Sequence, residues 1–303
     1  MDQLAGTIIL LPILTGIALI AVSRRVKAIT AHWITLIAAG LTALCGALLL
    51  PYAQDSAVFA ISWFPNTGPM GITTGASGLY AVAATGGGLS LILLSTANQH
   101  TGFHPLSGAL MLMTLSAANV ALLTDHFLAR YVALEIVVLA VALAPLITRR
   151  DRATAQAIWE SYLMLRIGDA GLLAAIPLLN AASGTLSITP ALAAGQSLKG
   201  PALGWIICGM ALAGWVKLGG LPFHRWSRPG NRLSLPIQAW LYATVIPNLG
   251  AYLLYRVTPL LSLDTIAGTI ILWLAAVGAL LAAYGLIYTR PQDGLTYVGA
   301  AYA

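Results

Sequence analysis

Long runs of apolar residues alternate with short polar segments along the whole chain. Each run approaches or exceeds the roughly 20 residues that an α-helix needs to cross a bilayer. The pattern predicts membrane spans at residues 4–22, 29–51, 76–97, 105–124, 128–147, 158–179, 203–221, 235–256 and 265–288. We therefore expect an all-α fold, a polytopic membrane helical bundle with nine full transmembrane helices.

The segments outside these spans predict two extramembrane loops and a short end. Residues 52–74 contain Trp, Phe, Asn, Gly and Pro, and residues 180–200 are rich in Ala, Ser, Gly and Pro, which favours turns. Residues 294–303 are too few for a helix to cross roughly 30 Å of hydrocarbon. They predict a C-terminal half-span.

Composition and charge agree with a protein of the lipid bilayer. Hydrophobic residues make up 59% of the chain and charged residues 8%, with a mean hydropathy of +0.86. The net charge of +6 does not indicate nucleic acid, because the basic residues form short clusters between the apolar runs. If the spans alternate, these clusters share one side of the membrane, and only Lys199 clearly falls on the other. They are Arg24, Arg25 and Lys27; Arg149, Arg150 and Arg152; Arg225, Arg228 and Arg232; and Arg290.

This asymmetry predicts the orientation. Basic loops face the cytoplasm, so we expect a multi-pass protein of the cell (inner) membrane with its N-terminus on the outer side. Cys45 and Cys208 lie in separate apolar runs and are expected to be buried small side chains, not a disulfide or a metal pair. The sequence has no Cys cluster or nucleotide-binding loop, so we expect no cofactor and no metal.

Lys217 is the most informative charged residue. No charge occurs between Pro201 and Val216, so Lys217 is expected near hydrocarbon depth, where an ionisable group is costly and usually functional. Gly219 and Pro222 follow and predict a broken helix around residues 217–222. The alternative is a lysine that extends from a helix end toward the lipid headgroups.

Three other ionisable residues fall inside predicted spans. Glu135 lies in the fifth span, and Arg166 and Asp169 lie three residues apart in the sixth, on one helical face. We expect Arg166 and Asp169 to pair near Glu135, either as a structural ion pair or in proton handling. Glu135 is expected to pair with Lys217. The turn between the fourth and fifth predicted spans is expected to be solvated. Its polar residues are Asp125, His126 and Arg130.

These residues occur in an ordered set of motifs. The motifs are Tyr131–Glu135; Arg166–Asp169 (Arg-Ile-Gly-Asp); Lys217 after Gly-Trp; Leu221–Trp226 (Leu-Pro-Phe-His-Arg-Trp); and Gly250–Arg256. The set resembles the antiporter-like subunits, the large proton-translocating membrane subunits of respiratory complex I (above all its L type), Mrp-type antiporters and membrane-bound hydrogenases. The clear similarity covers about residues 105–256.

The resemblance implies two inverted five-helix repeats, each with a broken helix. It divides the chain into N-terminal helices and a loop (1–104), a first antiporter-like repeat (105–256) and the incomplete start of a second repeat (257–303). The implied partners are other membrane subunits of a multisubunit complex, with protons or monovalent cations as the transported ions.

The resemblance also implies residue roles. Lys217 matches the pumping lysine, and Glu135 matches the carboxylate that controls the charge of that lysine. Arg166 and Asp169 match the Arg-Ile-Gly-Asp element of the family. His224 matches a histidine at the cytoplasmic end of the broken helix.

The sequence departs from the family pattern at several positions. Tyr242 stands where L-type subunits carry a histidine. A tyrosine with an unperturbed pKa of about 10 cannot relay protons near neutrality as a histidine can. The segment 228–236 lacks the usual acidic residue and Pro-Thr-Pro-Val-Ser sequence, and most of the second repeat, with its own lysine, is missing.

Three functions fit these observations. The first is proton or cation/proton translocation by a non-catalytic membrane subunit, through a buried Glu–Lys pair. The second is the proton-conducting membrane subunit of a DAB-type inorganic carbon (CO2/bicarbonate) uptake pump. The third is a non-conducting structural paralogue that keeps its ion pairs for packing.

Overall fold

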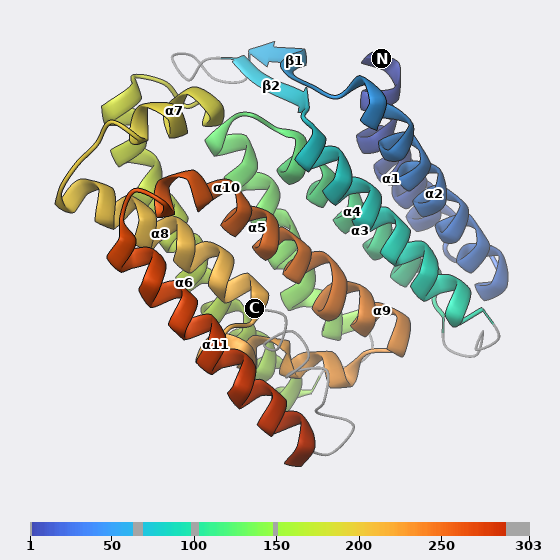
Figure 1. Cartoon of the computed structure of the whole chain (residues 1–303). Helices are drawn as coiled ribbons and strands as arrows, with labels where there is room; N and C mark the ends of the chain where they lie inside the picture. The colour runs from blue at the N-terminus through green and yellow to red at the C-terminus, as the bar shows by residue number, and fades with distance from the viewer. Residues whose placement is uncertain (1, 63–68, 98–102, 148–150, 289–303) are drawn as a thin grey trace.

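The computed structural model describes residues 2–62, 69–97, 103–147 and 151–288, and its long helices run side by side in one elongated bundle (Figure 1). The α-helices are α1 (Asp2–Val22), α2 (Ala28–Leu49), α3 (Ala76–Ser95), α4 (Pro105–Leu123), α5 (Phe127–Leu143), α6 (Arg152–Ser183), α7 (Ile188–Gly195), α8 (Pro201–Leu218), α9 (Leu235–Trp240), α10 (Ile246–Leu261) and α11 (Thr265–Tyr288). Most of the interior side chains are apolar, as the mean hydropathy of the chain predicts.

The structure agrees with a helical membrane bundle. Within its described residues, α1 to α6 and α8 make seven helices that are long and apolar enough to cross a membrane. The prediction of nine full spans is not confirmed. Residues 235–256 fall on α9, a π-helical turn (Leu241–Val245) and α10, while α11 covers 265–288. The predicted half-span at 294–303 and the basic residues Arg149, Arg150 and Arg290 lie outside the described residues.

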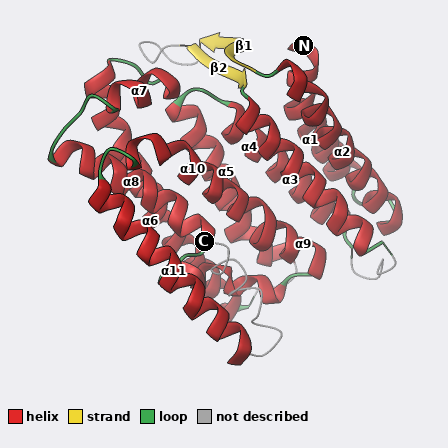
Figure 2. Ribbon diagram, in the orientation of Figure 1, coloured by secondary structure: helices red, strands yellow, loops and turns green. Residues whose placement is uncertain are grey.

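The fold is mostly helical, as predicted, but the turn-rich loop predicted at 52–74 also forms strands. This segment contains an antiparallel hairpin of β1 (Gln54–Ser62) and β2 (Pro69–Thr74), which lies at the same end of the bundle as α7 (Figure 2). The Asn, Gly and Pro residues that indicated a loop are concentrated toward its middle, whereas the flanking Val, Phe and Ile residues favour strands. The loop predicted at 180–200 likewise contains α7.

Helix α6 is longer than the span predicted at 158–179. It begins at Arg152 because the Asp151 carboxylate accepts a hydrogen bond of 2.7 Å from the amide of Thr154, an N-cap of the kind that stabilises a helix by about 1 kcal/mol. It ends at Ser183, and the next residue, Gly184, has a φ of 69°, the left-handed conformation typical of a helix C-terminus. The first turns of α6 are polar, so the apolar pattern of the sequence did not predict that they are helical.

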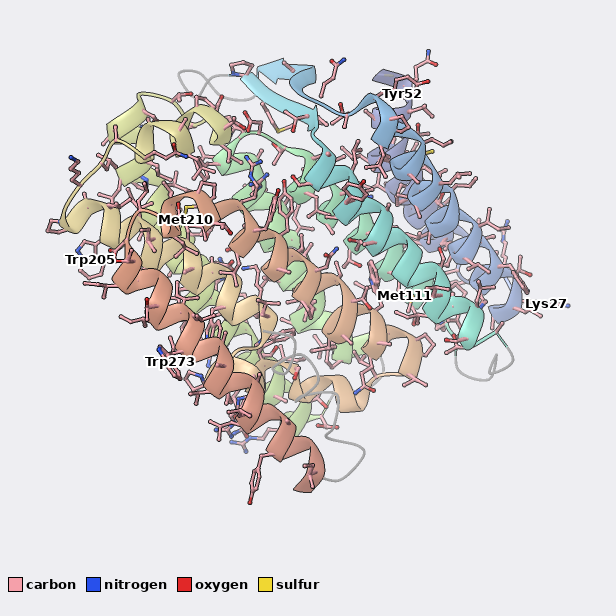
Figure 3. The ribbon with its side chains drawn as sticks, viewed as in Figure 1. Lys27, Tyr52, Met111, Trp205, Met210 and Trp273 are labelled. Carbon is pink, nitrogen blue, oxygen red and sulfur yellow. The ribbon has the colours of Figure 1, made fainter. Side chains whose placement is uncertain are left out.

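The principal helix contacts join α1 to α4, α2 to α3, α6 to α8, and α8 to α10. Met111 is fully buried on α4, whereas Trp205 and Trp273 are 72% and 67% exposed on the outside of α8 and α11 (Figure 3). Large apolar side chains are also exposed along α1 and α2. Such surfaces are expected where a bundle faces lipid or another membrane subunit.

Two glycine contacts bring α8 unusually close to its neighbours. A Cβ atom on Gly171 of α6 would lie 2.6 Å from the carbonyl oxygen of Gly209 on α8. A Cβ atom on Gly250 of α10 would lie 2.8 Å from the carbonyl oxygen of Gly214 on α8. Small residues at helix crossings allow this approach in membrane proteins. Short side chains on α6 can therefore reach α8.

The break predicted at residues 217–222 is present as the end of α8. Gly219 has a φ of 78°, and the amides of Gly219 and Gly220 donate bonds of 3.0 Å to the carbonyls of Val216 and Trp215, as in a glycine-terminated helix. The chain then continues as a 3-10 helix, Phe223–Arg232, and not as a second α-helical half.

Candidate functional site

Asp169 on α6 and Lys217 on α8 form an ion pair inside the bundle. The Lys217 side chain is 0% exposed and that of Asp169 is 1% exposed. Lys217 occupies the last turn of α8, but its side chain does not extend toward the surface as the alternative prediction required. A buried charge of either sign is stable only with a partner, and here each residue is the partner of the other.

Glu135 on α5 and Arg166 on α6 form a second ion pair. The Arg166 guanidinium also bonds to the hydroxyls of Tyr162, at 2.8 Å, and Tyr131, at 3.3 Å, and it lies over the ring of Tyr162. The Glu135 side chain is 12% exposed and that of Arg166 is 33% exposed. This pair therefore lies closer to the bundle surface than the Asp169–Lys217 pair.

The predicted partners are exchanged in the structure. Arg166 does not pair with Asp169, and Glu135 does not pair with Lys217. Helical side chains lean toward the N-terminus, so the long Arg166 side chain extends back along α6 to Tyr162 and across to α5. The short Asp169 side chain cannot follow it and contacts α8 instead.

The four charges nevertheless form one electrostatic cluster, which we call the charge quartet: Glu135, Arg166, Asp169 and Lys217. Glu135 lies within electrostatic range of Asp169, Arg166 and Lys217. Oε2 of Glu135 and Oδ2 of Asp169 are both buried without a hydrogen-bond partner. Each carboxylate thus engages its cation through one oxygen and keeps the other available to accept a proton or a donor.

His224 and Tyr242 lie beyond the helix break. His224 is half-buried in the 3-10 segment. Tyr242 is 2% exposed within the π-helical turn, and its hydroxyl donates to the carbonyl of Val141 on α5 at 3.1 Å. The Tyr242 ring stacks on Trp226, with ring centroids 5.7 Å apart. Tyr242 therefore connects the segment after the break to α5.

Trp226 holds the segment after the break against α8 and α6. Its indole Nε1 donates to the carbonyl of Val216 at 2.8 Å, and its own carbonyl accepts a bond of 2.7 Å from the Ser161 hydroxyl. The π turn ends at Val245, two residues before Pro247, which has no amide hydrogen to donate and disfavours a regular preceding turn. π turns are often found at functional sites.

Sequence reasoning misplaced the residues of the α4–α5 turn. His126 and Arg130 are 2% and 3% exposed, so the prediction of a solvated turn is wrong for these two residues, whereas Asp125 is partly exposed. Arg130 donates to the carbonyls of Ala121, at 2.9 Å, and Thr124, at 2.7 Å. A basic side chain just beyond a helix C-terminus can donate to the last carbonyls of that helix. The position of Arg130 shortly after α4 was therefore the sequence signal for this contact.

Comparison with known proteins places these residues in a family. A family model described as NADH:quinone oxidoreductase/Mrp antiporter, TM matches residues 124–290, more than half of the chain. The Na(+)/H(+) antiporter subunit A1 of Staphylococcus haemolyticus is 23% identical over 241 residues, which are 74% of this chain and 29% of that protein. The NADH-quinone oxidoreductase subunit L of Campylobacter jejuni is 30% identical over 131 residues, which are 43% of this chain and 22% of that protein.

The fold also matches a solved structure. A chain of respiratory complex I from Thermus thermophilus superposes with a TM-score of 0.81 at 21% identity, and the match covers 99% of this chain and 62% of that chain. This likeness concerns the fold. The chain spans less than a third of the length of both curated relatives.

Proposed function

The chain belongs to the NADH:quinone oxidoreductase/Mrp antiporter transmembrane family, and from this premise we propose that it translocates protons, or exchanges cations for protons, as one membrane subunit of a multisubunit complex. The observation that carries the proposal is the charge quartet, with its fully buried Lys217. Intramembrane charges are costly and mark ion and proton paths. The membrane subunits of such a complex are the partners that its exposed apolar helices suit.

The quartet supports a proton step based on an exchange of partners. A proton that reaches the free Oε2 of Glu135 neutralises this carboxylate, and Arg166 then loses its partner. Arg166 now attracts Asp169, which is three residues away on the same helix. As Asp169 turns from α8 toward Arg166, Lys217 is left unpaired in a buried site. Burial without a counter-charge disfavours the ammonium, so Lys217 releases its proton.

The helix break provides the exit for that proton. Lys217 lies two residues before Gly219, where the regular backbone of α8 ends. Backbone freed at membrane depth is tolerated where it lines a polar path. His224, in the segment that follows, is the first titratable side chain along the chain after Lys217. Tyr242 has a structural role in this scheme, since its hydroxyl is bonded to a backbone carbonyl.

The proposal includes nine spans with the N-terminus outside, which places the start of α6 in the cytoplasm. We expect a cysteine at Ala153 to react with an impermeant thiol reagent only from the cytoplasmic side. A cysteine at Ala182, near the other end of α6, should react only from outside. Both positions are exposed. The native Cys45 and Cys208 are replaced by serine beforehand, and reversed labelling would contradict the proposed topology.

Proton movement itself is measured in inside-out membrane vesicles. Vesicles energised by respiration build up a pH gradient that a fluorescent dye reports, and added Na⁺ or K⁺ then collapses this gradient if cations are exchanged for protons. We expect deletion of the chain to reduce either the gradient or its collapse, and the affected phase identifies the activity. If both phases match the wild type, the proposed function is wrong.

A further inference from the structure

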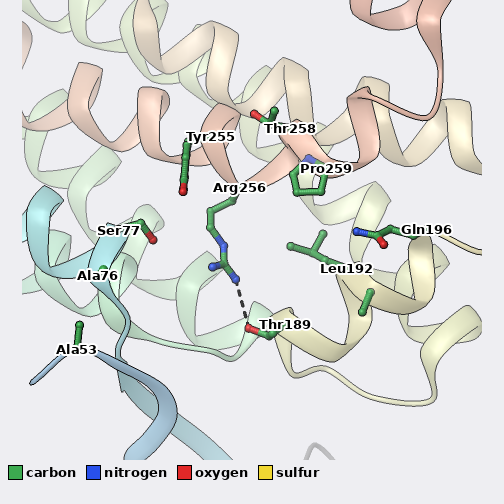
Figure 4. Close-up of a pocket in the computed structure, with 11 residues that line it drawn as sticks. Ala53, Ala76, Ser77, Thr189, Leu192, Gln196, Tyr255, Arg256, Thr258 and Pro259 are labelled. Atoms are coloured by element: carbon green, nitrogen blue, oxygen red, sulfur yellow. Dashed lines mark hydrogen bonds between the residues drawn. The ribbon is translucent and has the colours of Figure 1, made fainter.

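A second polar site lies at the end of the bundle that carries the hairpin and α7, away from the charge quartet. Here α10, α7 and the start of α3 enclose an open pocket of about 690 Å³. Figure 4 shows the Arg256 side chain extending from α10 across this pocket to Thr189, with Ser77 on one side and Leu192 and Gln196 on the other. Arg256 ends the Gly250–Arg256 motif, to which the proton step assigns no role.

The Arg256 guanidinium has unused hydrogen-bonding capacity. A guanidinium carries five N–H donors. Nη2 donates a long bond of 3.4 Å to the Thr189 hydroxyl, while Nε is buried and has no hydrogen-bond partner. Among the side chains that the structure describes, which exclude that of Asp55, no carboxylate lies at ion-pairing distance from Arg256. The geometry therefore leaves a forked, positively charged donor without an anionic acceptor.

The surrounding charges do not neutralise this arginine. Asp125 accepts two bonds from Thr189, from the amide at 3.0 Å and from the hydroxyl at 2.8 Å. Asp125 and Arg256 both act electrostatically on Arg130, whose own donors bond to the end of α4. Two arginines thus share one nearby carboxylate. Among the described side chains, two arginines and one carboxylate therefore lie beside the pocket.

The start of α3 adds to the positive potential. Ala76 and Ser77, in its first turn, line the pocket, and the N-cap residue Gly75 provides no side-chain acceptor for the first amides. Such amides carry partial positive charge and favour anions. The Ser77 hydroxyl is a further donor. Arginine together with amide and hydroxyl donors is a typical environment for a phosphate group.

The remaining lining favours a phosphate that belongs to a lipid. Leu192, Ala193 and Pro259 give the pocket an apolar wall, and Tyr255 beside it is 62% exposed. The pocket lies where α3 begins and α10 approaches its end, at the boundary expected for headgroups. Tyrosine is enriched at this depth. A phosphodiester with attached acyl chains matches both the polar and the apolar parts.

We propose that this pocket binds a phosphate group, supplied by a phospholipid of the adjacent leaflet, with Arg256 as its principal ligand. The phosphate oxygens accept hydrogen bonds from the Arg256 fork and the Ser77 hydroxyl, and the glycerol and first methylenes contact Leu192 and Pro259. Inorganic phosphate offers the same oxygen acceptors but cannot use the apolar wall. Bound lipid would fix α7 and the start of α3 to α10.

The test compares Arg256→Gln with the wild type in the purified, delipidated complex. Binding of phosphatidylglycerol and of inorganic phosphate is measured separately, per copy of the chain. We expect Arg256→Gln to weaken phosphatidylglycerol binding about tenfold or more, as for loss of a charge-assisted bidentate contact. Arg256→Lys should have a smaller effect, because it keeps the charge but loses the fork. Arg152→Gln, an exposed arginine at the start of α6, is the matched control and should bind as the wild type does.

The two ligands separate the sources of the phosphate. Arg256-dependent binding of phosphatidylglycerol supports a lipid site, whereas Arg256-dependent binding of inorganic phosphate alone supports the phosphate site and overturns its assignment to lipid. Equal binding of both ligands by the wild type and Arg256→Gln overturns the proposal. If Arg256→Gln does not fold, Arg256→Lys and Ser77→Ala provide the comparison. Unchanged binding in both of these variants overturns the proposal as well.

Discussion

Replacing Lys217 with arginine is expected to abolish proton transport while the complex still assembles. Arginine keeps a positive charge opposite Asp169, but its guanidinium stays protonated in proteins and cannot release a proton. Transport is measured in vesicles by the pH-sensitive dye, and assembly by co-purification of the partner subunits. Transport at the wild-type rate would contradict a role of Lys217 as the proton carrier.

A matched pair of variants tests whether Lys217 carries protons or only stabilises the fold by pairing with Asp169. Lys217→Met alone leaves Asp169 buried without a partner, and breaking a buried ion pair in this way costs about 3–5 kcal/mol. We expect a reduced yield of folded protein. The double variant Lys217→Met/Asp169→Asn removes both charges, so the yield should recover while transport remains absent. Recovery of transport together with the yield would assign the pair to packing alone.

The sequence was sufficient to place the charges but not to pair them. Lys217 stands out because no charge precedes it between Pro201 and Val216, and a charge in such a run is expected to be buried with a partner. Its partner depends on which helices are neighbours and on the direction of short side chains. Gly171 and Gly209 determine the close approach of α6 to α8, and this crossing makes Asp169 the partner of Lys217. Neither fact follows from residue spacing along one helix.

Other features were hidden for comparable reasons. In the sequence Arg130 follows a polar turn, but in the structure its guanidinium donates to backbone carbonyls at the end of α4. The π turn around Tyr242 leaves a trace only in Pro247, because a proline is compatible with several helix distortions. The helix break after Lys217 was predictable, since Gly219 and Pro222 act locally. Local signals therefore predicted where α8 ends, while tertiary contacts decide which groups lie beside that end.

Glu135→Gln is expected to uncouple transport with little loss of stability. When Glu135 is replaced, Arg166 keeps its bonds to the hydroxyls of Tyr162 and Tyr131. The variant should therefore assemble normally. Glutamine keeps the shape of the side chain but cannot take up the proton that starts the exchange of partners. We expect a loss of transport comparable to that of Lys217→Arg in the same vesicle assay.

The double variant Glu135→Gln/Arg166→Gln decides between coupling and packing. If the pair only holds α5 against α6, the defect of Glu135→Gln comes from an Arg166 without an anionic partner. Removing the Arg166 charge as well should then restore transport. The exchange of partners instead requires that Arg166 be charged, because Arg166 is the group that draws Asp169 away from Lys217. The double variant should then fold at least as well as Glu135→Gln and remain inactive. Transport restored to the wild-type rate would refute the exchange, and a loss confined to assembly would do the same.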